Sequence, residues 1–239
     1  MSIIKEALQY INSLALGNAE VKQVGGQIFS GKELALIPEP TASTLTVRSL
    51  SGLVDYLVNN YDNWGPVLLH VESPTDVKVV SGFNRDYRRD CLIRAEALLP
   101  TIPFERFLDV ENFNILLQSC FVPTVDRDSI LKIVGNLKED NVKTTGDDGV
   151  SQTVTAKTGI TTVADVVLPN PAELKPFRTF IDIPQPACSF VFRMQEGPRA
   201  GLFEADGGAW KLQAMASIKE YLVENLSEEI DNDFVTIIA

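Results

Sequence analysis

The chain has 239 residues, of which 45% are hydrophobic and 22% charged, and its 32 acidic residues outnumber its 21 basic residues to give a net charge of -11. A chain of this length can bury a sizeable core without help from disulfides or a structural metal. The acidic balance argues against a protein that grips nucleic acid through bulk positive charge. The single histidine, His70, excludes every site that is built from two or more histidines.

The N-terminal sequence and the cysteines bear on the compartment. The first residues contain neither a basic region nor a continuous apolar region, so we expect no secretory signal. No stretch of the sequence approaches the roughly 18 apolar residues that span a bilayer. Cys91, Cys120 and Cys188 are odd in number, widely spaced and set among apolar residues, which is typical of buried free thiols. These features predict a cytoplasmic protein.

The N-terminal part of the chain predicts two helices and a small antiparallel sheet. Apolar residues recur at helical spacing over Ile4–Ala15, which predicts an opening amphipathic helix. The stretch Val21–Ser43 is rich in glycine, proline and serine and is expected to be a loop. A second helix that begins with a serine cap is predicted over Ser51–Asn60. Apolar runs separated by turn residues then predict strands at Val67–Val71, Val77–Phe83 and Cys91–Ala97.

The middle of the chain predicts two helices followed by a polar hairpin. Asp109 is expected to cap a helix that runs to Cys120, and either Asp126 or Asp128 is expected to cap the next helix. Over residues 141–162 large apolar side chains nearly vanish, and Asp148-Gly149 indicates a hairpin tip. Because such a hairpin cannot bury a face in its own core, we predict a polar β-hairpin arm that is exposed or completes its burial on another subunit.

The C-terminal part predicts short strands around one long helix. The strands are expected at Val163–Leu168, Ser189–Arg193, Leu202–Glu204 and Phe234–Ile238. The helix is expected over Trp210–Leu226, with an apolar stripe formed by Leu212, Met215, Ile218, Leu222 and Val223. The whole pattern predicts a single α+β domain over residues 1–239, with mostly antiparallel sheets, packed helices and the arm at 141–162.

Two acidic residues and the histidine are candidates for chemistry. Glu204 and Asp206 stand two residues apart in a predicted strand, so both carboxylates would lie on one face, where they could share a magnesium ion. Magnesium favours a larger set of ligands, however, and Asp206 is also placed to cap the helix near Trp210. We favour capping and expect no metal or cofactor. His70 lies inside a predicted strand, and the chain has no Gly-x-Ser-x-Gly motif for it to serve, so we expect a structural histidine and no catalytic residue.

The most distinctive stretch is residues 169–186, which we call the proline band. Its five prolines fix backbone angles and predict an extended, irregular course over the surface. Phe177, Arg178 and Phe180 within it are suited to anchoring in a groove, either of this chain or of a neighbouring subunit, and we favour packing within the fold. Together with Arg193 and Trp210, these three residues are the candidate binding or interface residues.

Four runs of sequence carry a family resemblance. They are Asp147–Gln152, Asn170–Phe180, Gln185–Arg193 and Leu202–Trp210. In combination they resemble the YfdQ-like family, a family of uncharacterised phage and prophage proteins, and the similarity extends from about Val67 to Leu222. The resemblance implies a phage-encoded protein made in the bacterial cytoplasm. It implies no reaction, because the family has no established activity and no catalytic residues to transfer.

Three hypotheses for the function remain open. The first is a non-enzymatic phage accessory protein that self-assembles into a homo-oligomer, such as a ring or a hollow shell, through the arm, the proline band and the final strand. The second is a phage anti-defence module that sequesters a nucleotide or other ligand, with Arg178, Arg193 and the arginines between Arg85 and Arg94 contacting phosphate. The third is a magnesium-dependent enzyme acting on nucleic acid or nucleotides through Glu204 and Asp206. We favour the first, with no nucleic-acid or membrane partner.

Overall fold

The computed structural model describes residues 21–30, 35–38, 40–135, 142–147, 152–158, 162–167, 170–195, 197 and 199–239. Over these residues the chain has an α+β fold whose sheets are mostly antiparallel, as predicted. The helix predicted over Ile4–Ala15 lies outside the described residues. None of the described helices combines the length and the apolar character that a membrane span requires.

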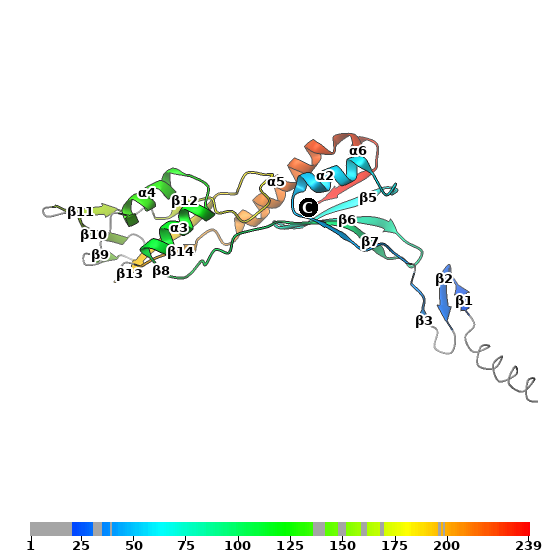
Figure 1. Cartoon of the computed structure of the whole chain (residues 1–239), viewed down its shortest axis with the longest axis horizontal. Coiled ribbons are helices and arrows are strands. Elements are labelled where there is room, and N and C mark those ends of the chain that lie inside the picture. The colour runs from blue at the N-terminus through cyan, green and yellow to red at the C-terminus, as the bar shows by residue number, and fades with distance from the viewer. Residues whose placement is uncertain are drawn as a thin grey trace, which may run out of the picture.

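A five-stranded sheet forms one half of the elongated molecule (Figure 1). Its order is β15-β5-β6-β7-β4, with β5, β6 and β7 in the predicted antiparallel meander and the outer strands β4 and β15 paired in parallel. The bounds are β4 Leu45–Val47, β5 Val67–Ser73, β6 Asp76–Phe83, β7 Arg89–Glu96 and β15 Val235–Ile238. In β5, Leu69 and Val71 are buried while His70 between them is half-buried, because successive side chains of a strand point to opposite faces.

Three helices cover one face of this sheet, namely α2 (Leu50–Asn59), α5 (Ala209–Asn225) and α6 (Ser227–Asp231) (Figure 1). The side chain of Ser49 caps α2 by accepting a hydrogen bond from the Gly52 N–H at 3.1 Å. The predicted stripe on α5 is partly wrong, since Leu212 is 74% exposed and Val223 is exposed as well. The buried residues of α5 follow a strict spacing of four and are Ala214, Ile218 and Leu222. The apolar core between these helices and the sheet is called the α2–α5 cluster below.

A four-stranded antiparallel sheet with two helices forms the other half (Figure 1). Its order is β12-β13-β14-β8, with β8 at Leu108–Asp109, β12 at Ala172–Leu174, β13 at Cys188–Gln195 and β14 at Arg199–Glu204. Five phenylalanine rings dominate its interior, which is called the α3–α4 cluster below, and they are Phe104, Phe113, Phe121, Phe190 and Phe192. The helices that enclose it are α3 (Val110–Cys120) and α4 (Val125–Gly135).

The starts of α3 and α4 test the predicted caps. Asp109 caps α3, as expected, by accepting a hydrogen bond from the Asn112 N–H at 2.9 Å. The cap predicted for α4 is wrong, because the Thr124 hydroxyl accepts from the Arg127 N–H at 3.1 Å and Asp126 and Asp128 lie within the first turn. Acidic residues in a first turn also favour the helix, through its dipole, so the same sequence signal fits both arrangements.

Two small three-stranded sheets lie at opposite ends of the long axis (Figure 1). One contains β1 (Val21–Val24), β2 (Gln27–Ser30) and β3 (Ala35–Leu36), which corrects the loop predicted for Val21–Ser43. Gly25 and Gly26 between β1 and β2 have φ values of 59° and 90°, the left-handed conformation of a tight two-residue hairpin turn. The short strands and the glycine-rich composition concealed this hairpin from sequence reasoning.

The other small sheet contains the predicted arm. Its order is β11-β10-β9, with β9 at Val142–Asp147, β10 at Gln152–Thr158 and β11 at Thr162–Val167. The predicted hairpin corresponds to β9 and β10, while its tip at Asp148-Gly149 lies outside the described residues. The strand predicted at Val163–Leu168 pairs with β10 and so extends the hairpin to three strands.

The proline band and α5 join the two halves of the molecule. In the band, Leu174 belongs to the α3–α4 cluster, while Phe180 and Ile183 belong to the α2–α5 cluster. In α5, Trp210 packs against the α3–α4 cluster, while Ile218 is buried in the α2–α5 cluster. The two clusters are therefore linked by two segments that each contribute side chains to both.

Candidate functional site

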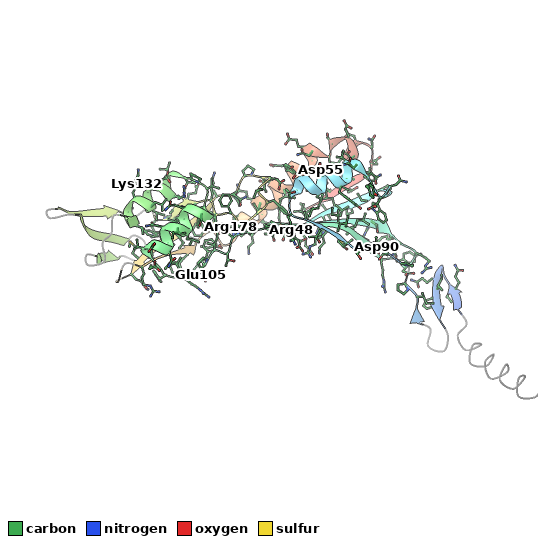
Figure 2. All side chains as sticks on the ribbon, viewed as in Figure 1. Arg48, Asp55, Asp90, Glu105, Lys132 and Arg178 are labelled. Atoms are coloured by element: carbon green, nitrogen blue, oxygen red, sulfur yellow. The ribbon has the colours of Figure 1, made fainter. Side chains whose placement is uncertain are left out.

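Arg178 lies near the middle of the long axis, between the two halves of the molecule (Figure 2). Its side chain is held among three aromatic rings, with the guanidinium carbon 4.3 Å from the ring centre of Trp210, 4.9 Å from that of Phe104 and 5.3 Å from that of Phe190. One guanidinium nitrogen, Nη1, also lies 3.0 Å from Oε1 of Glu204. Arg178 is only 6% exposed, so the rings and one carboxylate replace the water that the charge loses on burial.

The predicted metal ligands Glu204 and Asp206 each serve another partner. Glu204 ends β14 and pairs with Arg178, while Asp206 lies in the turn that follows. The Asp206 carboxylate accepts hydrogen bonds from the Gly208 N–H at 2.9 Å and from the Trp210 N–H at 3.2 Å. It therefore holds the start of α5, as the capping alternative predicted, although the N-cap residue is Gly208 and not Asp206. Within the described part of the chain, no group of three or more His, Cys, Asp or Glu side chains is placed to hold a metal ion.

The groups around Arg178 include two with shifted pKa values, Asp206 and Cys188. Burial works to raise the pKa of Asp206, but the backbone hydrogen bonds from Gly208 and Trp210, together with Cys188 and the charge of Arg178, outweigh burial and lower the pKa. Burial and the neighbouring Asp206 carboxylate raise the pKa of Cys188 to about 12. Cys188 is therefore a protonated thiol at neutral pH and lacks the thiolate character of a nucleophile.

The remaining candidate residues do not converge on one site. Phe180 is fully buried in the α2–α5 cluster, while Phe177 is half-buried beside a separate cavity of about 270 Å³. Arg193 is half-buried and alternates along β13 with the buried Phe192 and Met194, so it lies on the sheet face opposite to them. Arg178 packs against Phe190, on the other face of β13, so Arg178 and Arg193 are not placed to bind the same phosphate group.

Three of the four arginines from Arg85 to Arg94 have acidic or aromatic partners. Arg85 pairs with Asp86 at 3.2 Å, and Arg94 pairs with Asp76 across the sheet. The guanidinium carbon of Arg89 lies 4.3 Å from the ring centre of Phe83. These contacts fit the locally neutral surface that the interleaved acidic residues indicate, and they do not form a basic patch.

A larger cavity, of about 800 Å³, opens at the end of the five-stranded sheet that is remote from Arg178. Three segments line it, which are residues 40–45 leading into β4, residues 56–64 at the end of α2, and residues 81–92 of the β6–β7 hairpin. We call it the aromatic cavity, because its lining includes Tyr56, Tyr61, Trp64 and Phe83. The carboxylates of Asp62 and Asp90 lie among these rings. Figure 2 places Asp90 at this end of the sheet.

Sequence reasoning missed the aromatic cavity. Its local signal is the density of aromatic residues at the end of α2, where Tyr56, Tyr61 and Trp64 fall within nine residues that also contain Asp62. The opposite wall comes from the β6–β7 hairpin. This hairpin is distant in sequence from residues 56–64, so no local pattern indicates that the two segments face the same cavity. Only the pairing of the strands brings the two walls together.

Comparison with known proteins gives no relative: no family model matches the chain, and no curated protein or solved structure is significantly similar to it.

Proposed function

We propose that this protein is a non-enzymatic protein of phage or prophage origin that acts in the bacterial cytoplasm by assembling into a homo-oligomer through its two small sheets. The observation that carries the proposal is the position of these sheets, β1–β3 and β9–β11, at opposite ends of the long axis (Figure 1). The phage origin rests on the resemblance carried by the proline band and the runs around it.

The described side chains of the β1–β3 sheet form no core of their own. Its strands have four, four and two residues and pair only with one another among the described residues. None of its described side chains is buried, and Val24 is 59% exposed. A sheet this small needs a hydrophobic face against another surface to be stable. A second copy of the chain would supply such a surface.

The β9–β11 sheet has a similar need. Its strands have six, seven and six residues, and valine and alanine are their only apolar residue types. Within the described part of the chain, no further strand pairs with the outer edges of β9 and β11. An open edge presents unpaired N–H and C=O groups to which a strand of a neighbouring copy can add.

The arrangement favours head-to-tail contact between copies. A contact between the β1–β3 end of one copy and the β9–β11 end of the next is heterologous, so repetition produces a closed ring or shell when the rotation between copies closes. The final strand, β15, is already paired with β5 of its own chain. It is therefore not the exchanged element in this proposal.

The test is the mass of the purified full-length protein, measured by size-exclusion chromatography with light scattering. We expect a multiple of the 26.3 kDa chain mass, and closed particles in negative-stain images. Replacement of residues 141–162 by a short Gly-Ser linker should lower the mass while both apolar clusters remain folded. As a control, the double substitution of the exposed Glu111→Ala and Lys132→Ala on α3 and α4 should leave the mass unchanged. A clean monomer at micromolar concentration for the full-length chain contradicts the proposal.

A further inference from the structure

We propose that the aromatic cavity binds a small organic ammonium cation. This inference goes beyond assembly and concerns a different part of the molecule. The cavity volume of about 800 Å³ falls within the range of small-molecule sites, which are mostly apolar with a few convergent polar groups. The question is which chemistry those polar groups select.

One wall of the cavity is held in place by a chain of hydrogen bonds. Asn60 ends α2 in the left-handed conformation, with a φ of 39°, and its Oδ1 accepts from the Trp64 N–H at 2.9 Å. The indole N–H of Trp64 donates to the Tyr56 hydroxyl at 2.7 Å, and that hydroxyl donates to Oδ2 of Asp62 at 2.9 Å. The rings of Tyr56 and Trp64 and the carboxylate of Asp62 are therefore positioned before any ligand arrives.

The opposite wall is fixed by the β6–β7 hairpin and the segment that leads into β4. The Asp90 N–H donates to the Ser81 hydroxyl at 3.0 Å, which holds the Asp90 backbone against the neighbouring strand. The Thr44 hydroxyl donates to the Cys91 carbonyl at 2.8 Å, which ties the third lining segment to β7. Hydrogen bonds therefore order the wall at the end of α2 internally and join the other two walls to each other through Thr44 and Cys91, so the cavity is a feature of the folded chain.

The charge of the lining selects a cation. Among the sixteen described residues that line the cavity, Asp62 and Asp90 are acidic and none is lysine, arginine or histidine. Arg89, which lies outside the lining, stacks on the Phe83 ring, so a cation on an aromatic ring already occurs beside the cavity. Aromatic ring faces attract ammonium groups, and carboxylates pair with them, whereas an anion would be repelled by both.

Tyr61 gives the cavity an open aromatic ring at its mouth. It is 88% exposed, although it lines the cavity, so its side chain has little packing within the fold. A large exposed ring in a lining that also contains two carboxylates is a suitable contact for a methylated or primary ammonium group. Because Tyr61 contributes little to the core, it can be replaced without unfolding the chain.

The test is calorimetric titration of the full-length protein with choline and, separately, with its neutral isostere 3,3-dimethyl-1-butanol. We expect saturable binding of choline and markedly weaker binding of the neutral alcohol. Asp90→Asn should weaken choline binding about tenfold, through loss of an ion pair in a partly apolar site. Tyr61→Ala should weaken it about two- to fivefold, as expected for one exposed cation–ring contact.

Two matched controls separate the site from the general acidity of the chain. Asp55→Asn removes an exposed carboxylate of α2 that does not line the cavity, and Tyr87→Ala removes a tyrosine that is 74% exposed at the β6–β7 turn. Both should leave choline binding unchanged. Equal binding of the neutral alcohol, equal effects of the control and test substitutions, or no binding of choline at all would each overturn the proposal.

Discussion

Arg178 is a buried arginine that packs against three aromatic rings, and it shows what such a residue contributes. Its guanidinium contacts the rings of Phe104, Phe190 and Trp210 and pairs with Glu204. The planar group can stack on a ring face while an edge nitrogen reaches a carboxylate, which a lysine ammonium cannot do. Arg178 therefore joins the proline band to β14 and to the start of α5.

We expect Arg178→Lys to lower the free energy of unfolding by about 2 kcal/mol, because the stacked, desolvated contact is lost while the positive charge remains buried. Urea denaturation at neutral pH measures this loss. The matched control is Arg199→Lys, where the side chain is exposed and donates one hydrogen bond to the Phe107 carbonyl at 3.1 Å. A loss at Arg178 no larger than that at Arg199 would show that the ring contacts contribute nothing specific.

Asp206 predicts a pH dependence of stability. Its pKa in the folded protein is lower than its ordinary value of 3.8, so its contribution to stability is complete above that value and is lost as the pH falls through the folded pKa. We expect Asp206→Asn to cost about 1 kcal/mol at pH 7, because only one of the two acceptor oxygens remains and the negative charge near Arg178 is lost. The difference from the parent protein should shrink in urea titrations at acidic pH. Asp55→Asn, at an exposed position on α2, should show no comparable pH-dependent loss.

At the residue scale, local roles could be predicted from sequence and distant ones could not. Asp109 and Asp206 accept hydrogen bonds at helix starts from backbone groups only a few residues away, so spacing alone indicates these contacts. The partners of Arg178 come from three separate segments of the chain, and no spacing rule connects them. This is why the sequence indicated that Arg178 mattered without indicating what it contacts.

At the scale of elements, the proline band is stabilised by one amide. Oε1 of Gln185 accepts from the Arg178 N–H at 2.9 Å and from the Thr179 N–H at 3.2 Å. Its Nε2 donates to the Thr179 carbonyl at 3.3 Å and to the Phe180 carbonyl at 3.1 Å. An irregular segment has no ladder to satisfy its backbone, so this buried side chain takes the place of a neighbouring strand.

We expect Gln185→Ala to lower the free energy of unfolding by about 3 kcal/mol, because it leaves several buried backbone groups without partners. Gln185→Glu should be nearly as damaging, since a carboxylate cannot donate to the carbonyls of Thr179 and Phe180. The control is Gln213→Ala on the exposed surface of α5, which should change stability little. Guanidinium denaturation followed by circular dichroism makes the comparison, and equal stabilities for the two alanine variants would contradict this role for Gln185.

Elements with strong periodicity were predicted well, and those with weak or mixed signals were not. The meander β5–β7 lies close to its predicted position, because apolar alternation and turn residues agree there, and α5 lies close to its predicted bounds. The β1–β2 hairpin was missed because four-residue strands are too short to show alternation. The stripe on α5 was drawn too wide because the helix is buried only along a narrow line through Ala214, Ile218 and Leu222.

At the scale of the whole molecule, the chain is elongated and has two apolar clusters with a small sheet beyond each (Figure 1). The order of the predicted helices and strands indicates an α+β fold but contains no information about how the apolar residues divide between clusters. The aromatic cavity has the same origin, since its walls come from α2, the entry to β4 and the β6–β7 hairpin. A feature built by segments that are distant in sequence can be recognised only from the three-dimensional structure, whereas a single helix or strand can be predicted from its own residues.

The length of α5 determines how its contacts with one half of the molecule are rotated about the helix axis relative to its contacts with the other half. Its 17 residues span about 25 Å, with Trp210 beside Arg178 at one end and Leu222 in the α2–α5 cluster near the other. One residue inserted between them would turn Trp210 by about 100° around the helix axis, away from the guanidinium. The length of α5 is therefore fixed as strictly as its buried side chains, and insertions can accumulate in the connecting turns while this helix keeps its residue count.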